Sequence, residues 1–498
     1  MKSNAWKVLT AALVLGIAGD GLLRGGDWRL GFAIWIVAVI AAVFVLGGRT
    51  TRPALLLLGG MALAAFGFVW RDAEMLYAID LLSLLCVGAL ALWYGSGGDF
   101  GALTIVETVR AGIIALVNSI GGAVSVVGEL TTATDGTATR SSVRALLIGA
   151  VLALPPLALV ASLLASSDVV FDGVLQRVLT IITSDGLRHL VIITLLAWIT
   201  TGWLRASMGD GAGSALPHAP SPGLSFTSVA VGLYALIALL GLFVITQARV
   251  VFGGAAFLRE TAGLTVASYA RSGFFQLIFA AVVVLITLVV AQWLMDDDDD
   301  AGHLQFTIAG AVLLALVATL LVSAAVRIWL YVSEFGLSAD RTFASAGIVW
   351  VTGLLITLAL TTLRGRPMQF MPVAIAVSVA WVATVNLINP EALVVHVNTS
   401  RAAAGQPFDA EYHAKLSADA VPSLVRAAPR LAPADCQRLE VALRLVWAAR
   451  IAPPPPMKRG DWRSMALPRM RAEAWHTSRV ALCPASVSLS ERVAPSPP

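Results

Sequence analysis

The sequence predicts an all-α fold, that of a polytopic helical integral membrane protein with roughly eleven transmembrane helices. Hydrophobic residues make up 58% of the 498 residues and charged residues only 13%, whereas a soluble domain carries about a quarter charged residues. The apolar residues form continuous runs, such as Phe274–Val290, that suit a hydrocarbon core of about 30 Å. These runs do not alternate in short segments, so a closed β-barrel is not expected.

Each hydrophobic run predicts the position of one transmembrane helix. The predicted spans are residues 8–23, 30–47, 54–70, 75–94, 144–166, 186–204, 226–247, 272–294, 304–326, 343–362 and 370–388. The first span resembles a signal peptide, but no small-residue cleavage site follows it, so we expect a retained helix. Pro155 and Pro156 lie inside the fifth span and should kink it, because neither residue has a backbone donor.

Two further segments have one polar face and one apolar face, as interfacial helices do. The first is residues 103–129, where Glu107 and Asn118 belong to the polar face. In the second, Ser167–Thr183, polar residues recur every fourth position and therefore share one face: Asp168, Asp172, Gln176 and Thr180. We predict that both segments lie on the membrane surface. For the second, a short helix packed among the spans fits the pattern equally well.

Composition divides the chain into five parts. After Asn389-Pro390 the continuous apolar runs end, and apolar helical patterns alternate with charges. The prolines Pro453–Pro456 then favour a stiff extended break. The predicted parts are 1–94, an N-terminal four-helix transmembrane segment; 95–143, an interfacial amphipathic linker; 144–389, the transmembrane core; 390–450, a small helical domain at the membrane surface; and 451–498, a proline-rich break, a short helix and a disordered tail.

The positive charges do not decide the orientation by number, because Lys and Arg are divided evenly between the two sets of loops. The early residues Lys2, Lys7, Arg49 and Arg52 favour a cytoplasmic N-terminus. An odd number of spans then predicts an extracytoplasmic C-terminal domain. In an oxidising compartment Cys436 and Cys483 could pair, and two unpaired thiols remain the alternative.

A series of short motifs follows the fifth span. They are Ala165-Ser-Ser-Asp168-Val-Val-Phe171, Phe252-Gly253-Gly254, Gly263–Phe275, Arg327–Ser338, Asn389-Pro390-Glu391-Ala392-Leu393, Leu416–Pro422 and Asp461-Trp462-Arg463-Ser464. In order and spacing these motifs resemble the bacterial multi-pass membrane family catalogued as domain of unknown function 4173, over roughly residues 140–470. Ser268 departs from the pattern, where an acidic residue is expected. The resemblance implies a multi-pass protein of a bacterial inner membrane and supplies no reaction.

Polar residues near the ends of the later spans form a candidate functional surface. Arg249 follows the seventh span and could pair with Asp168 or Asp172 if these loops lie on one side of the membrane. At the end of the ninth span, Arg327, Tyr331 and Glu334 are spaced at i, i+4 and i+7 and therefore share one face of the helix. Ordinary helix-end anchoring is the alternative. The candidate residues are Asp168, Asp172, Arg249, Tyr269, Arg271, Arg327, Tyr331 and Glu334.

Asp80 is a separate case, because it lies about one turn into the fourth span. A charge in hydrocarbon costs roughly 2.5–3.5 kcal/mol on insertion scales, so such residues are often functional. Arg71, Asp72 and Glu74 precede it closely, however, and a position at the interface is the alternative.

No catalytic residue, cofactor or metal site is predicted. The run Asp296–Asp300 suits a solvated turn better than a calcium loop, because consecutive side chains diverge. The histidines lack the spacing of a zinc site, and no phosphate-binding glycine loop or serine nucleophile motif is present. Basic residues in the C-terminal region suit anionic lipid headgroups, and without a recognition motif no nucleic-acid partner is expected.

Three classes of function fit these observations. The scarcity of buried polar groups favours an envelope accessory or signalling protein, whose partners are the lipid bilayer and another membrane or envelope protein. A small-molecule or lipid transporter is the second class, although no inverted repeat is visible. A lipid-linked glycosyltransferase-like enzyme is the third, but its candidate loop with Asp20 and Asp27 is too short to build a site.

Overall fold

A computed structural model describes residues 2–24, 28–48, 51–95, 98–99, 103–131, 157, 160–161, 163–182, 185–210, 222–262, 274–296, 300–451, 461–478 and 480–483. In these ranges the regular secondary structure is helical, apart from an isolated β-bridge between Leu224 and Met295. The predicted all-α membrane fold is therefore confirmed.

Ten helices in the described ranges are long and apolar enough to cross a bilayer. They are α1 (Lys2–Leu23), α3 (Arg52–Trp70), α4 (Glu74–Gly95), α5 (Ile105–Thr131), α8 (Asp185–Arg205), α9 (Phe226–Ala262), α11 (Phe274–Leu294), α12 (Asp300–Phe335), α13 (Ala339–Leu360) and α14 (Phe370–Ile388). Local signals start several of them: Pro53 lies in the first turn of α3, and the Ser338 hydroxyl accepts a hydrogen bond from the Arg341 amide at the start of α13.

The structure differs from the predicted membrane segments in two places, and one predicted span is not tested. Residues 30–47 form the shorter apolar helix α2 (Leu30–Val45). Most of the predicted span 144–166, with its prolines, lies outside the described residues. Residues 103–129, predicted to lie on the membrane surface, form α5, of which Ile105–Ala123 could cross the bilayer. The polar face of α5 points into the bundle, because Glu107 and Asn118 are buried and α5 packs on α4 and α8.

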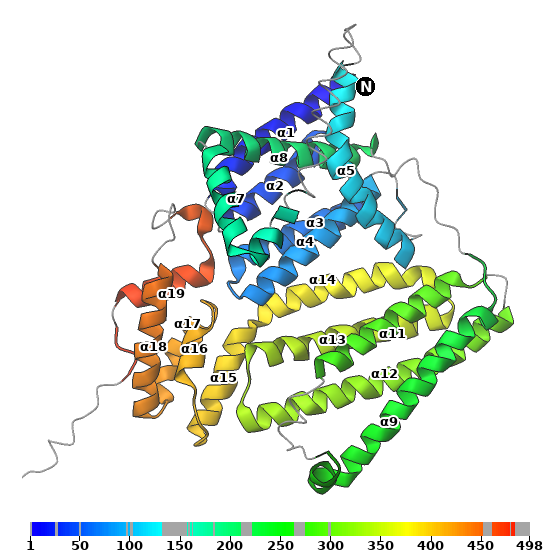
Figure 1. The fold of residues 1–498 in the computed structure, drawn as a ribbon, viewed down its shortest axis with the longest axis vertical. Helices are drawn as coiled ribbons and strands as arrows, with labels where there is room; N and C mark the ends of the chain where they lie inside the picture. The colour runs from blue at the N-terminus through cyan, green and yellow to red at the C-terminus, as the bar shows by residue number, and fades with distance from the viewer. Residues whose placement is uncertain are drawn as a thin grey trace, which may run out of the picture.

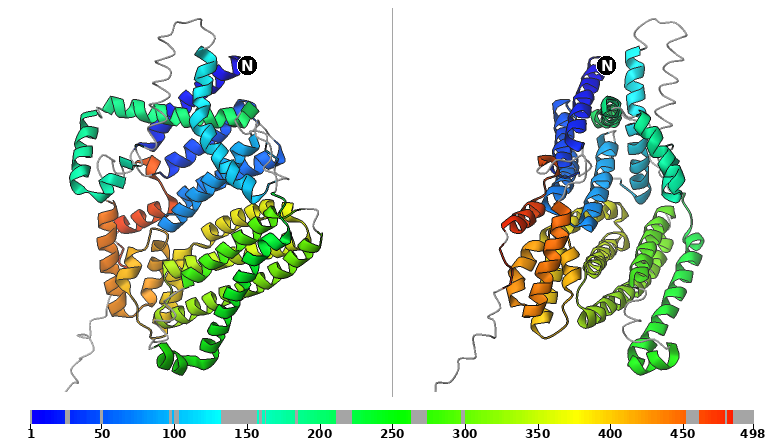
Figure 2. Two further views of the ribbon diagram at one scale, coloured as in Figure 1. Left: turned by 45° about the vertical axis from the view of Figure 1, so that its right-hand side comes forward. Right: turned by 60° about the vertical axis from the view of Figure 1, so that its left-hand side comes forward.

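The ten long apolar helices and the shorter helix α2 form two bundles, which Figure 1 and Figure 2 show one above the other. The N-terminal bundle contains α1–α5 and α8 around one apolar core. The C-terminal bundle contains α9 and α11–α14 around a second core. Helix α14 joins the two bundles, since its residues Met371, Ile375 and Val379 pack against the N-terminal core.

Small residues bring helices of the N-terminal bundle into backbone contact. A Cβ placed on Gly122 of α5 would overlap the Cα of Gly202 in α8, and a Cβ on Gly202 would overlap the Asn118 carbonyl oxygen. The indole nitrogen of Trp198 donates to the Ile120 carbonyl at the same crossing, at 2.8 Å. Close approach at small residues is how helices associate in lipid, where no hydrophobic effect drives them together.

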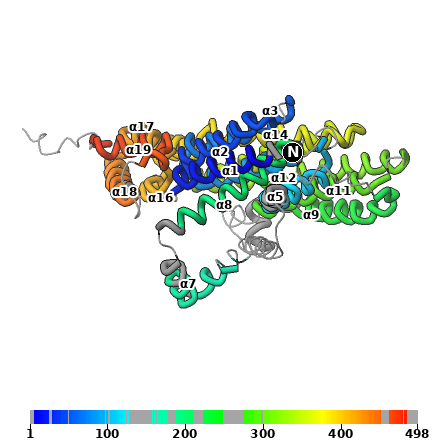
Figure 3. The backbone as a smooth tube through the Cα atoms, turned by 90° about the horizontal axis from the view of Figure 1, so that it is seen from above, coloured from blue at the N-terminus to red at the C-terminus, as the bar shows by residue number. Residues whose placement is uncertain are grey.

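Asp168 caps the N-terminus of α7 (Val169–Ile182). Its carboxylate accepts hydrogen bonds from the amides of Val170 and Phe171 at 2.7 and 2.9 Å. Figure 3 shows α7 to one side of the layer formed by the other helices. This position of the amphipathic helix α7 is consistent with the predicted surface location.

The π-helical turn η2 (Ala206–Asp210) extends α8.

After α14 the chain forms a C-terminal helical domain around its own apolar core. Its elements are α15 (Pro390–Ala403), α16 (Ala410–Lys415), α17 (Val421–Ala427), η6 (Ala428–Arg430), α18 (Pro433–Ile451), η7 (Trp462–Ser464) and α19 (Leu467–Ser478). Ala472 and Leu482 are buried in this core, so α19 and residues 480–483 belong to the same domain as α15–α18. A disulfide joins Cys436 to Cys483, with the two Cα atoms 5.8 Å apart.

The C-terminal domain lies at the end of the bundles opposite the start of α1 (Figure 1). The end of α1 contacts it through the Arg463 side chain, which donates to the Gly21 carbonyl at 2.7 Å. The turns η4 (Thr362–Arg364) and η5 (Pro367–Gln369) lie between α13 and α14 at the other end of the spans. The first and last described parts of the chain are thus on opposite sides of the spanning helices.

Candidate functional site

A three-residue loop between α3 and α4 is inserted into the C-terminal domain. Asp72 and Ala73 of this loop are buried. Their backbone amides both donate to Oδ2 of Asp419, at 2.6 and 2.9 Å, and the Ala418 amide donates to Oδ2 of Asp72 at 3.3 Å. Each aspartate therefore accepts hydrogen bonds from the backbone of the opposite segment, which fixes the two segments in register.

Arginines from three elements neutralise these carboxylates. Arg29, before α2, lies 2.8 Å from Oδ1 of Asp72, and Arg469 of α19 lies 2.7 Å from the same oxygen. Arg71 lies 3.5 Å from Oδ1 of Asp419. Buried ionised groups require such partners, because removing a charge from water costs several kcal/mol, by order of magnitude.

Arg71 also holds the end of α14. Its Nε donates to the Asn386 carbonyl at 2.5 Å and a terminal nitrogen donates to the Leu387 carbonyl at 3.0 Å. These are carbonyls that the last turn of a helix leaves without a partner. Burial lowers the pKa of Arg71, and the neighbouring Asp419 carboxylate raises it again in part.

Glu391 completes the cluster from the first turn of α15. Its Oε2 accepts the Ser417 amide at 2.9 Å and the Ser417 hydroxyl at 2.5 Å. Asn389 has a left-handed backbone, caps α15 through the Ala392 amide, and donates from Nδ2 to the Asp419 carbonyl at 3.1 Å. We call the set Arg29, Arg71, Asp72, Glu391, Asp419 and Arg469 the joint.

Burial raises the pKa of two carboxyls in the joint. For Glu391 the value rises from 4.5 to about 7. For Asp419 burial also raises the pKa, while the amides of Asp72 and Ala73 and the Arg71 guanidinium oppose the rise. A carboxyl with a raised pKa holds a proton in the folded state that the unfolded chain releases. Its contribution to stability is therefore present below pH 4.5 and lost as the pH rises through about 7.

We expect wild-type protein in detergent to lose more stability between about pH 5 and about pH 8 than the Glu391→Gln variant does. The difference should be roughly 2 kcal/mol, since one pKa unit corresponds to about 1.4 kcal/mol and hydration of the site offsets part of the change. The variant is compared with wild type because burial also lowers the pKa of His413. That shift makes the protein more stable as the pH rises, and it is present in both proteins. Melting curves across this range measure it, and parallel curves for the two proteins would contradict it.

Asp80 lies beneath the joint, inside α4. It is 1% exposed and accepts a hydrogen bond at Oδ1 from Nδ2 of Asn386 in α14, at 2.8 Å. Its Oδ2 is buried without a hydrogen-bond partner in the described structure. Asp80 thus ties α4 to α14 just below the loop that enters the C-terminal domain.

A second contact fixes the turn between α12 and α13 to the same domain. Asn398 of α15 accepts the Leu337 amide at 2.8 Å and donates to the Leu337 carbonyl at 2.7 Å. Arg401 donates to the carbonyls of Ser333 and Glu334 at 2.5 and 3.0 Å. Both transmembrane bundles are therefore attached to the C-terminal domain.

The residues of the predicted functional surface are distributed over several places. Arg327 is buried and donates to Gln247 of α9 at 2.9 Å. The Tyr331 ring lies 3.9 Å from the Arg341 guanidinium, and the Glu334 carbonyl accepts Arg401.

Asp168 precedes α7 and is exposed, and Asp172 in the first turn of α7 is partly buried. The Arg249 side chain, Tyr269 and Arg271 lie outside the described residues.

The joint was missed as a site, although two of its segments were among the motifs noted in the sequence. Glu391 belongs to the motif Asn389–Leu393 and Asp419 to Leu416–Pro422. A third motif, Asp461–Ser464, supplies the Arg463 contact to Gly21. The signal that could have found the joint is the presence of acidic residues inside such motifs at the point where the spans end.

Residues 58–427 match the family described as Domain of unknown function (DUF4153). The chain belongs to this family. The expectation of a family of unknown function is therefore correct, although the matching family is 4153 and not the 4173 that the motifs suggested. The matched region contains Arg71, Asp72, Glu391 and Asp419 of the joint. No curated protein and no solved structure matches the chain.

Proposed function

We propose that this protein is an accessory or signalling component of the bacterial inner membrane, which holds its C-terminal domain on the outer face to contact another envelope protein. The joint carries this proposal. The ion pair from Asp72 to Arg469 and the hydrogen bonds between the Asp72 loop and Asp419 attach the domain to helix ends of the N-terminal bundle. A domain attached in this way transmits a change at its surface to the spanning helices, which a flexibly linked domain would not do.

The orientation is supported by two independent features. Positive charges near the N-terminus favour a cytoplasmic start, and the C-terminal domain lies at the opposite end of the spans. The domain also contains the Cys436–Cys483 disulfide. Disulfides persist in oxidising compartments such as the bacterial periplasm and are rare in the cytosol.

An exposed apolar stripe on α18 is the surface we assign to the partner. Val441 and Leu445 are 60% and 67% exposed, and their i, i+4 spacing puts them on one helix face. By contrast, two hollows between the spanning helices measure about 20 and 160 Å³. Small-molecule sites occupy about 300–1,000 Å³, so these hollows favour an interaction protein over a transporter.

The location is tested by counting thiols in protein denatured directly from cells. A maleimide polymer should modify one cysteine, Cys86, without reductant and all three after reduction. A phosphatase fused after Pro498 should be active. Three reactive thiols without reductant, together with an inactive phosphatase, would place the domain in the cytoplasm and contradict the proposal.

The partner is tested by placing a photo-crosslinking amino acid at Val441 or at Leu445 in the native bacterium. We expect a discrete adduct with one envelope protein at both positions. The matched control is Lys415, which is exposed on α16, and it should give no such adduct. Equal labelling at Lys415, or no adduct at Val441 and Leu445, would argue against the stripe as a partner surface.

A further inference from the structure

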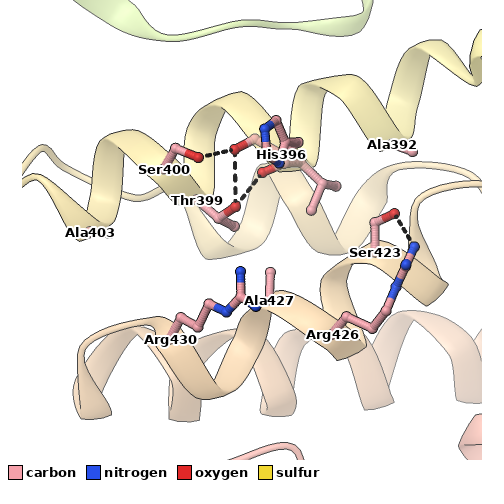
Figure 4. A pocket seen from close by; sticks show the side chains of 10 residues that line it. Ala392, His396, Thr399, Ser400, Ala403, Ser423, Arg426, Ala427 and Arg430 are labelled. Atoms are coloured by element: carbon pink, nitrogen blue, oxygen red, sulfur yellow. Dashed lines mark hydrogen bonds between the residues drawn. The ribbon is translucent and has the colours of Figure 1, made fainter.

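A groove lined with basic residues and hydroxyls lies between α15 and α17 in the C-terminal domain. Figure 4 shows His396, Thr399 and Ser400 on α15 opposite Arg426 and Arg430. The groove has a volume of about 400 Å³, and none of the described residues that line it is acidic. This volume falls within the range of about 300–1,000 Å³ that is typical of ligand sites.

A second hollow, of about 130 Å³, adjoins the groove at the joint. Arg426 lines both hollows, and Arg71 and Arg471 are added in the second. Asp419 is the acidic residue in this lining, and its Oδ2 already accepts two backbone amides while Arg71 faces its Oδ1. The two hollows together therefore present an excess of positive charge.

The arginines keep donors available for a ligand. Among the described residues, the Arg430 side chain has no hydrogen-bond or ion-pair partner. Arg426 donates to the Pro422 carbonyl at 3.1 Å and to the Ser423 hydroxyl at 3.4 Å, neither of which is a charged acceptor. Arg471 acts on Arg71 as a charge of the same sign. An anion in the hollows would remove this repulsion and occupy the free donors.

The hollows lie at the level where spanning helices end. Trp70, the last residue of α3, lines the second hollow. At the end of α14, Leu387 and Ile388 are 71% and 59% exposed. In a bilayer these side chains would contact acyl chains, which places the neighbouring arginines at the depth of lipid headgroups.

We propose that the groove between α15 and α17 binds a phosphate group, carried either by an anionic phospholipid or by a free phosphate ester. The guanidinium fork of Arg matches phosphate oxygens in two parallel hydrogen bonds. Arg426 and Arg430 supply these forks, and His396 faces them across the groove. This site does not depend on which side of the membrane the domain occupies, so its test is separate from that of the proposed function.

The test compares ligands on the purified full-length protein by native mass spectrometry. Phosphatidylglycerol, phosphatidylcholine and glycerol 3-phosphate are titrated into wild type, into Arg426→Gln/Arg430→Gln, and into Lys415→Gln/Arg438→Gln. The last variant removes the same charge from exposed positions elsewhere in the domain. Melting curves confirm folding, and Arg430→Gln alone replaces the double variant if the latter is unstable.

If the ligand is a lipid, phosphatidylglycerol should bind wild type and the control alike and bind the groove variant about tenfold more weakly, while phosphatidylcholine binds all three equally. If the ligand is a free phosphate ester, glycerol 3-phosphate should show that difference. The proposal would be overturned if the groove variant bound phosphatidylglycerol as tightly as the control does and also bound glycerol 3-phosphate as tightly as the control does.

Discussion

Replacing Asp72 with Asn should lower the free energy of unfolding by about 3–5 kcal/mol, because it leaves the buried Arg29 guanidinium without its counter-charge. The Arg29 and Asp72 side chains are each only 8% exposed, and Arg469 shares the same carboxylate oxygen. We expect the loss to appear as detachment of the C-terminal domain. Thermal unfolding in detergent and proteolysis between the spans and the domain measure the two effects.

The matched control is Asp435→Asn. Asp435 pairs with Arg438 at 2.5 Å, but the Arg438 side chain is 69% exposed. Exposed pairs contribute about 0–1 kcal/mol, so this variant should unfold close to the wild-type temperature. If the two variants proved equally stable, the joint would not be what holds the domain.

Replacing Gly122 with Val should separate α5 from α8 and cost about 3 kcal/mol, at the upper end of the usual range for overpacking. A side chain at Gly122 meets the Gly202 backbone, which cannot move without displacing the whole helix. The readout is the melting temperature of the protein in detergent or nanodiscs.

Gly121→Val is the control for this substitution. It makes the same change one residue earlier in the same helix, where an added Cβ meets nothing within 4 Å. Any cost of a β-branched residue in a helix is shared by both variants. Equal destabilisation by the two substitutions would contradict the close α5–α8 packing.

Much of the fold could be predicted from the sequence because lipid imposes a simple rule. A segment in hydrocarbon must satisfy its own backbone and present apolar side chains, so a long apolar run indicates a helix at a known position. This reasoning failed for α5. Its polar residues Glu107 and Asn118 suggested water on one face, whereas the bundle itself covers them.

The candidate site was harder to predict. Arg327, Tyr331 and Glu334 were grouped because they share a helix face, yet they contact three different partners. The residues that do meet, Asp72 and Asp419, are separated by 347 positions in the chain. Their proximity depends on how helices pack, and spacing within a single helix contains no information about it.

The sequence by itself determined the solvent, the class of fold and most of the membrane-spanning segments, because apolar length and composition are local properties. Only the tertiary structure decided that Asp72, Glu391 and Asp419 form one cluster, that α5 packs inside the bundle, and that Arg426 and Arg430 face His396 across a groove. These features arise from contacts between segments far apart in the chain. Such contacts are selected by packing and by the need to pair buried charges.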